Sequence, residues 1–406
     1  MIWEQIRSNQ VKSIALVVLM AVLLLAIGYF VGLIFFDNWI AGLIIAAIVW
    51  GIMNLIAFSQ GDSIVLAMAG ARKISRDDHP RLFNVVEEMK IASGLEKMPD
   101  VYIIDDPALN AFATGRDENH TAVAITSGLL QKLNRDELQG VIAHEIGHIR
   151  NRDVRLMVLL SILLGAIVIL SWYATRFLFF SGAGGGRRGS SKGGGGGQII
   201  ILVVGLILMI LAPIAAQIIY FAVSRKREYL ADASSAQYTR YPEGLASALE
   251  KLATSNTQVQ KANKATAPMY IINPLEKRSL SAESLTSTHP PIAERIRILR
   301  AMAGGSYADY ERAYKAAKGG GGIMPVSALV AQDTVGLRAA SEDTGPVESV
   351  PQKIERARET SDLMYKLDNY RIIDCDCNTR LRIPPNYRSP TVRCPHCGRI
   401  HKTPNS

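Results

Sequence analysis

Two long apolar segments near the start of the chain place the strongest constraint on its fold. Residues 13–36 and 39–58 contain no charged side chain, and only Asp37 and Asn38 separate them. As a helix, each segment is long enough to cross about 30 Å of hydrocarbon. A signal peptide has a shorter apolar region that ends at a small-residue cleavage site, whereas the first segment here leads directly into the second. We therefore expect residues 1–58 to form a transmembrane hairpin.

Two further apolar segments, residues 156–180 and 199–223, predict a second transmembrane hairpin with a glycine-rich loop at residues 181–198. Basic residues are dense near the segment ends on the side that holds most of the chain: Arg7, Lys12, Arg72, Lys73, Arg150, Arg152, Arg155, Arg225, Lys226 and Arg227. The positive-inside rule makes this side cytoplasmic. We therefore expect a multi-pass protein of the cell (inner or plasma) membrane, with residues 59–155 and 224–406 in the cytoplasm.

The charge pattern also bears on partners. The net charge of +9 favours contact with the anionic headgroups of a lipid bilayer. Nucleic acid is disfavoured as a partner, because the basic residues flank membrane segments and do not form one long patch.

A metal-binding motif lies between the two predicted hairpins. His144 and His148 are four residues apart in a segment with helical apolar spacing, so both imidazoles can reach one metal ion. Glu145 projects beside that face, where it can act as general base on a water molecule at the metal. Asn134 followed by Glu137 predicts a capping box at the start of this helix. The pattern predicts a zinc hydrolase, and the alternative is a chance arrangement of satisfied polar residues.

A hydrolytic zinc site usually has a third protein ligand. The metzincin pattern would need Gly at position 151 and His at position 154, but the chain has Asn151 and Val154. A downstream acid must serve, and Glu228 and Asp232 lie four residues apart on one helical face. One can bind the metal while the other orients a ligand. On spacing alone, an ordinary solvated cluster beside Arg225–Arg227 remains an alternative.

Taken together, these motifs resemble the HtpX-type membrane zinc endopeptidases, which are relatives of the type I CAAX prenyl endopeptidase. The matching runs are Asn110–Gly115, Ala143–Asp153, Glu228–Asp232 and Thr288–Pro291. The resemblance implies that His144, His148 and Glu228 bind zinc, that Glu145 is the catalytic base, and that Asp232 supports a ligand. It implies an endopeptidase that hydrolyses misfolded or damaged membrane proteins. A prenyl-protein protease is the nearest alternative within the class.

The expected fold is a mainly α integral-membrane protein with a small α+β zincin-type protease core, formed by residues 59–155 and 224–318. Strands are predicted at residues 100–104, 111–115 and 121–126. The second of these can bind an extended peptide by strand addition. Its predicted substrate edge is Asn110, Ala111, Phe112, Ala113 and Thr114. The alternative is that these strands are core scaffold.

His289 precedes Pro290 and Pro291, which fix an extended entry to a helix. The resemblance suggests that this motif packs against the catalytic core. We assign His289 a catalytic role near the zinc or the developing oxyanion, and a structural hydrogen-bonding role remains equally open.

All four cysteines lie in the last part of the chain. Residues 319–351 are rich in small residues and predict a flexible linker, and residues 352–370 predict a helix. In residues 371–406, Cys375, Cys377, Cys394 and Cys397 have the spacing of a zinc ribbon with a structural zinc. Two disulfides are the alternative, which a cytoplasmic location disfavours. We expect two independent zinc sites. Three roles are open to the ribbon: recruiting substrate, binding a protein partner or binding nucleic acid. A membrane-anchored zinc adaptor is the alternative function.

Overall fold

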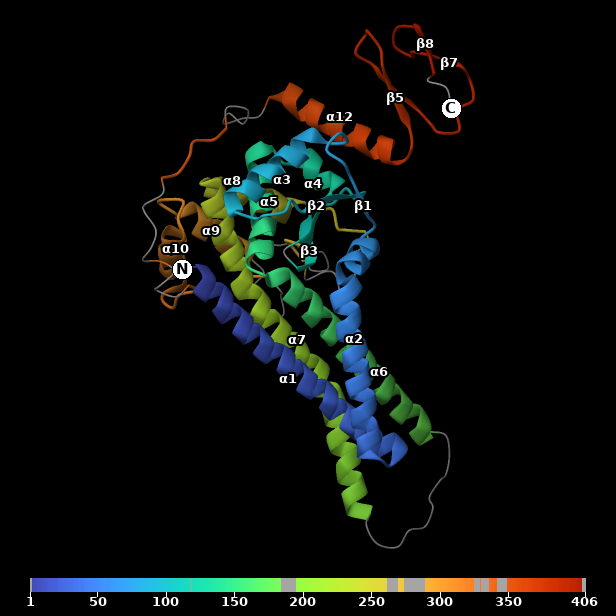
Figure 1. Cartoon of the computed structure of the whole chain (residues 1–406), viewed down its shortest axis with the longest axis vertical. Helices are drawn as coiled ribbons and strands as arrows, with labels where there is room; N and C mark the ends of the chain where they lie inside the picture. The colour runs from blue at the N-terminus through green and yellow to red at the C-terminus, as the bar shows by residue number, and fades with distance from the viewer. Residues whose placement is uncertain are drawn as a thin grey trace.

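Four long helices form the elongated part of the molecule (Figure 1): α1 (Ile2–Phe36), α2 (Trp39–Met68), α6 (Asp153–Ala183) and α7 (Gly195–Thr239). The structure, a computed structural model, describes residues 2–117, 119–183, 195–260, 269–273, 289–324, 329, 336–341 and 349–403. The middle of the glycine-rich loop, residues 184–194, therefore lies outside the described residues.

Helices α1 and α2 form the predicted hairpin because their backbones can touch. Asn38 caps α2, its Oδ1 accepting hydrogen bonds from Ile40 N at 3.0 Å and Ala41 N at 3.2 Å. A Cβ atom on Gly42 would lie 2.1 Å from Gly28 O and 2.6 Å from Gly32 Cα, so these positions require glycine for the close approach. Helix α2 continues to Met68, so the predicted boundary at residue 58 falls inside a helix.

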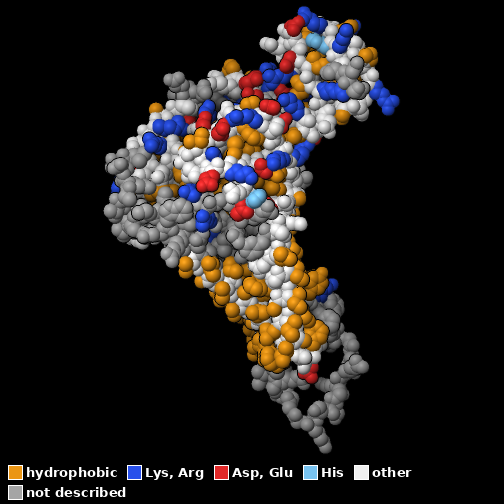
Figure 2. Space-filling model, viewed as in Figure 1, with side chains coloured by type: hydrophobic (Ala, Val, Ile, Leu, Met, Phe, Trp, Pro, Cys, Tyr) orange, Lys and Arg blue, Asp and Glu red, His pale blue; other side chains and the backbone are white. Residues whose placement is uncertain are grey.

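The helical bundle has an apolar surface. Figure 2 shows hydrophobic side chains gathered over it and charged side chains over the opposite end of the molecule. Within the described part of the chain, two helices are long and apolar enough to cross a membrane, through Val17–Ile34 and Trp39–Ile56 with mean hydropathies of 2.8 and 2.2. The apolar stretches described in α6 and α7 are shorter, Ile162–Arg176 and Val203–Ile218, so the second transmembrane hairpin stays a prediction.

A four-stranded sheet lies beyond one end of the bundle. Its strands are β1 (Ala71–Lys73), β2 (Asp100–Ile104), β3 (Ala111–Asp117) and β4 (His120–Thr126), in the order β1-β2-β4-β3. β2 and β4 are parallel and the other pairs are antiparallel. The three predicted strands are present, and β3 is an edge strand. β1 was not predicted, because its three residues, Ala-Arg-Lys, carry no strand pattern.

Helix α5 is the central helix of the core. It spans Arg135–Arg150. The other helices of the core are α3 (Pro80–Ser93), α4 (Ser127–Lys132), α8 (Pro242–Thr254), α9 (Ile292–Arg300) and α10 (Tyr307–Lys318). The predicted capping box is present: Glu137 N donates to Asn134 Oδ1 at 2.9 Å, and Asn134 N donates to Glu137 Oε2 at 2.8 Å. Leu138, Val141 and Ile142 of α5 are fully buried.

The C-terminal part consists of α12 (Val350–Leu367) and two hairpins, β5 (Arg371–Asp374) with β6 (Arg380–Ile383) and β7 (Thr391–Arg393) with β8 (Ile400–Lys402). Leu363 of α12 is 1 % exposed within the main core. Arg356 Nε donates to Gln131 O at 2.7 Å, at the end of α4. Within the predicted linker, Arg338 Nη2 lies 2.6 Å from Asp136 Oδ1. Within the described residues 336–341 of the predicted linker, the chain therefore contacts the core through Arg338.

Candidate metal centre

The two helices that carry the predicted ligands cross at a point lined by small residues. A Cβ atom on Gly147 of α5 would lie 2.9 Å from the Cβ of Ser234 of α7. Ser235 Oγ of α7 donates to Gly140 O of α5 at 2.7 Å. The glycine inside the H-E-x-x-H motif therefore lets α7 approach closely enough to bring its acidic residues to the histidines.

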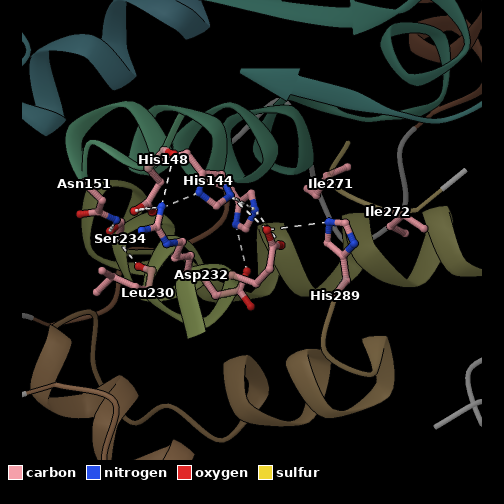
Figure 3. Close-up of polar contacts among 12 residues, drawn as sticks. His144, His148, Asn151, Leu230, Asp232, Ser234, Ile271, Ile272 and His289 are labelled. Carbon is pink, nitrogen blue, oxygen red and sulfur yellow. Dashed lines mark hydrogen bonds and ion pairs between the residues drawn. The ribbon is translucent and has the colours of Figure 1, made fainter. Parts of the chain in front are cut away.

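Three predicted ligands converge on one point, and Figure 3 shows two of them, His144 and His148, with Asp232 and His289 nearby. His144 Nε2 and His148 Nε2 are 3.2 Å apart, and Glu228 Oε2 and Oε1 lie 3.5 and 3.3 Å from them respectively. A tetrahedral zinc ion with bonds of about 2.0–2.2 Å places its ligand atoms roughly 3.3–3.6 Å apart. The spacing and chemistry of this donor set therefore fit a zinc ion.

Glu145 supports the same fit. Its side chain is 1 % exposed, and its Oε1 atom has no hydrogen-bond partner among the described residues. A buried carboxylate oxygen without a partner costs free energy unless a ligand, a water molecule or a metal satisfies it. The backbone N–H of Ala113 in β3 hydrogen-bonds the Glu145 carboxylate. The predicted base is thus positioned beside the ligands by the edge strand.

Each histidine turns its other ring nitrogen toward a buried carboxylate. His144 Nδ1 lies 3.0 Å from Asp232 Oδ1, and His148 Nδ1 lies 3.4 Å from Asp153 Oδ2. A carboxylate at Nδ1 favours the tautomer that carries its proton there and leaves Nε2 available to a metal. Asp232 has the supporting position that the resemblance implied, and Asp153 is a second such residue that sequence reasoning missed.

Each of these carboxylates is in turn bound by a buried arginine. Arg295 donates from Nε and Nη2 to Asp232 at 2.8 and 2.7 Å, and its Nη1 lies 3.2 Å from Glu228 Oε2. Arg227 Nη1 lies 3.2 Å from Asp153 Oδ1. Arg227 was interpreted as one of a run of basic residues at a membrane boundary, yet it is 5 % exposed. Its position beside Glu228 was a signal that it belongs to the site.

The acidic and basic groups shift one another's pKa values. Burial alone would raise the pKa of Glu228, but His289, His144, His148 and Arg295 hold it well below its usual range. Burial alone would lower the pKa of His148, but hydrogen bonds with Asp153 and Glu228 outweigh it and raise the pKa to about 10. The raised pKa of His148 means that a cation competes with a proton for this imidazole. Metal affinity is expected to fall as pH falls.

His289 also reaches the site. Its side chain is 6 % exposed, and its Nε2 lies 3.8 Å from Glu228 Oε1. Burial lowers the pKa of His289 to about 4, although the neighbouring Glu228 carboxylate acts in the opposite direction. Pro291 precedes α9 and sets the entry that brings His289 to the ligands.

The predicted substrate edge is partly paired within the chain. Ile271 N donates to Ala111 O at 2.9 Å, and Asn110 Nδ2 donates to Ile272 O at 2.9 Å. Alternate residues of a strand direct their backbone groups to the same side, so Ala111 and Ala113 both face outward from the sheet. Asn110 to Thr114 have buried side chains, and the outward N–H of Ala113 is bound to the Glu145 carboxylate.

The four cysteines form a second cluster. Cys375 Sγ lies 3.4 Å from Cys377 Sγ and 3.5 Å from Cys397 Sγ, and Cys377 and Cys394 are 3.6 Å apart. A disulfide needs about 2.05 Å, whereas four thiolates around zinc, with bonds of about 2.3 Å, lie roughly 3.8 Å apart. The arrangement fits the metal and does not fit the two disulfides.

Comparison with known proteins agrees with this geometry. The family model described as peptidase family M48 matches residues 76–303. The chain belongs to peptidase family M48. A protease HtpX homolog of Dictyoglomus turgidum is 46 % identical over 300 residues, which cover 74 % of this chain and 94 % of the relative. One of Streptococcus mutans is 45 % identical over 299 residues, covering 74 % and 99 %.

Membership of M48 confirms the HtpX-type resemblance, and the chain is a membrane-bound metalloprotease. The crystal structure of S. mikatae Ste24p aligns with a TM-score of 0.40 at 21 % identity, over 73 % of this chain and 66 % of that one. Residues 304–406, with α12 and the cysteine cluster, lie outside the M48 match.

Proposed function

We propose that this membrane-bound protease is a zinc-dependent endopeptidase that cleaves misfolded or damaged membrane proteins beside the bilayer. The observation that carries the proposal is the convergence of His144, His148 and Glu228 beside a buried carboxylate, Glu145. A zinc ion held by these ligands would polarise the scissile carbonyl and make water acidic enough to attack it.

Glu145 performs the proton transfers. Its carboxylate takes a proton from the attacking water as the new C–O bond forms, and it gives that proton to the departing amine as the C–N bond breaks. The Ala113 N–H keeps the carboxylate in place during both transfers. His289 lies near enough to the ligands to donate a hydrogen bond to the carbonyl oxygen as negative charge develops there.

A substrate strand would pair with β3 beyond Ala111, through the outward-facing carbonyl of Ala113 and the backbone of Gly115, while the Ala113 N–H stays with Glu145. Such pairing uses backbone atoms, so it tolerates many side chains and suits unfolded segments of different sequence. A prenyl-protein protease is less well supported. Within the described residues, the interior of the helical bundle is filled by side chains such as Leu24, Leu163 and Ala212.

An inert zinc adaptor is also less well supported, because its core would have no need of Glu145. We assign the cysteine cluster to a structural zinc in a ribbon that contacts a protein partner or substrate. The ribbon is tied to α12 through Asp362, which lies 2.5 Å from Arg380 Nη1 and 3.0 Å from Arg382 Nη2.

Zinc content and casein cleavage, measured together, test the function and both metal sites. We expect the detergent-purified protein to hold two zinc ions and to cleave casein. Glu228→Ala should hold one and be inactive, Cys375→Ser should hold one and remain active, and Asp232→Ala should lose less zinc than Glu228→Ala. A Glu228→Ala variant that keeps both ions would show that the ligand assignment is wrong.

For the topology, we propose that the protease core and C-terminal part are cytoplasmic and that residues 181–198 face outward. A cysteine introduced at Ser190 should react with a membrane-impermeant thiol reagent in intact cells, whereas native Cys397 should not. The reverse labelling pattern would overturn this orientation.

A further inference from the structure

The two helices that carry the metal ligands are joined at one end by a residue from outside the family match. Arg338 lies beyond residues 76–303. Its Nη2 donates to Asp136 Oδ1 at 2.6 Å, in the first turn of α5. Its Nε donates to Thr239 O at 2.9 Å, at the last residue of α7. A single guanidinium therefore contacts both helices.

Further contacts hold the segment around Arg338 against the two helices. Arg338 N donates to Arg240 O at 3.0 Å, and Ser341 N donates to Asp136 Oδ2 at 3.0 Å. The guanidinium also lies 4.9 Å from the centre of the Tyr241 ring. Both partners of the guanidinium suit a cation. Thr239 O is one of the last carbonyls of a helix, which are partially negative, and Asp136 is an acid that is only 3 % exposed.

The contacts of Arg338 with α5 and α7 bear on the relative position of the two helices that carry the metal ligands. Asp136 precedes His144 by eight residues, about 12 Å along the helix. Between them, α5 and α7 meet where Ser235 Oγ donates to Gly140 O at 2.7 Å, and they meet again beyond His144, where Gly147 lies against Ser234. A contact at the end of such an interface limits how far α7 can shift on α5, and hence the separation of Glu228 from the histidines.

We propose that Arg338 is a positioning residue for the metal centre: it ties the end of α7 to the start of α5 and thereby holds Glu228 at its distance from His144 and His148. The inference rests on the proposed zinc endopeptidase function. It makes the C-terminal part of this chain a component of the catalytic unit, in contrast to the independent appendix predicted from the sequence.

The test compares zinc affinity in the full-length protein and in variants by competition with a chelator. The ribbon zinc is a common background, because no cysteine changes. Arg338→Ala should bind catalytic zinc about tenfold more weakly, at the low end of the roughly 10–100-fold effect of losing outer contacts to a metal ligand. The value of kcat should fall when zinc is limiting and recover in excess zinc, with KM for a peptide unchanged. A purely structural role would lower the thermal midpoint without changing zinc affinity far below it.

Arg300→Ala is the matched control, because Arg300 also binds two carboxylates, Glu243 and Glu250, but does not bridge the ligand helices. It should retain zinc like the wild type. Asp136→Asn removes the other partner and should weaken zinc binding as Arg338→Ala does, with little further loss in the double variant. Wild-type zinc affinity in either Arg338→Ala or Asp136→Asn would overturn the proposal. A wild-type protein without catalytic zinc would instead overturn the proposed function.

Discussion

Replacement of Glu145 by Gln should leave zinc in the site and lower peptide cleavage by a factor of about 10²–10⁴, the usual contribution of a general base. The amide keeps the size of the side chain, and the three ligands His144, His148 and Glu228 are untouched. It cannot accept a proton from water, so the attack step loses its base. The measurement is initial casein cleavage beside zinc content in the same preparation.

Glu87→Gln is the matched control, because this substitution makes the same chemical change far from the metal ligands in sequence. Glu87 lies on the exposed face of α3, where it pairs with Arg76. It should leave the rate unchanged. Cleavage by Glu145→Gln within a few-fold of the wild-type rate, at equal zinc content, would contradict the assigned mechanism.

Arg295→Ala should destabilise the zinc-free protein by about 3–5 kcal/mol, the usual cost of removing one partner from a buried ion pair. Arg295 is 0 % exposed and binds both Asp232 and Glu228, so its loss leaves two buried carboxylates without their shared cation. Zinc compensates part of that charge, and ligand binding stabilises the folded state. The thermal midpoint of this variant should therefore fall most in the presence of a chelator and recover partly with zinc.

Arg297→Ala on the same helix is the control, because Arg297 lies on the exposed face of α9 and donates to Ala317 O. Its midpoint should change little with or without zinc. Equal midpoints for Arg295→Ala and the wild type in chelator would show that the arginine does not stabilise the acidic pair.

The parts of this protein that could be predicted from its sequence are those set by local periodicity. The four-residue spacing of His144 and His148 requires only a helix, and the capping box at Asn134 marks its start. The apolar segments that became α1 and α2 are defined by their length and lack of charge. The assignment of Glu228 as a ligand needed the family resemblance as well, because its spacing from Asp232 is equally compatible with a solvated charge cluster.

The tertiary structure decided which distant residues complete the site. Asp153 and Arg295 carry no spacing signal of their own, and Arg227 has only its position next to Glu228. Their roles arise from the crossing of α5 and α7 and the docking of α9. The pairing of Ile271 with the edge strand has the same origin. Arg338 is the extreme case, since 202 residues separate it from Asp136. Local pattern specifies helices and strands, but contacts between them depend on which surfaces can approach most closely, as Gly147 permits for the two ligand helices.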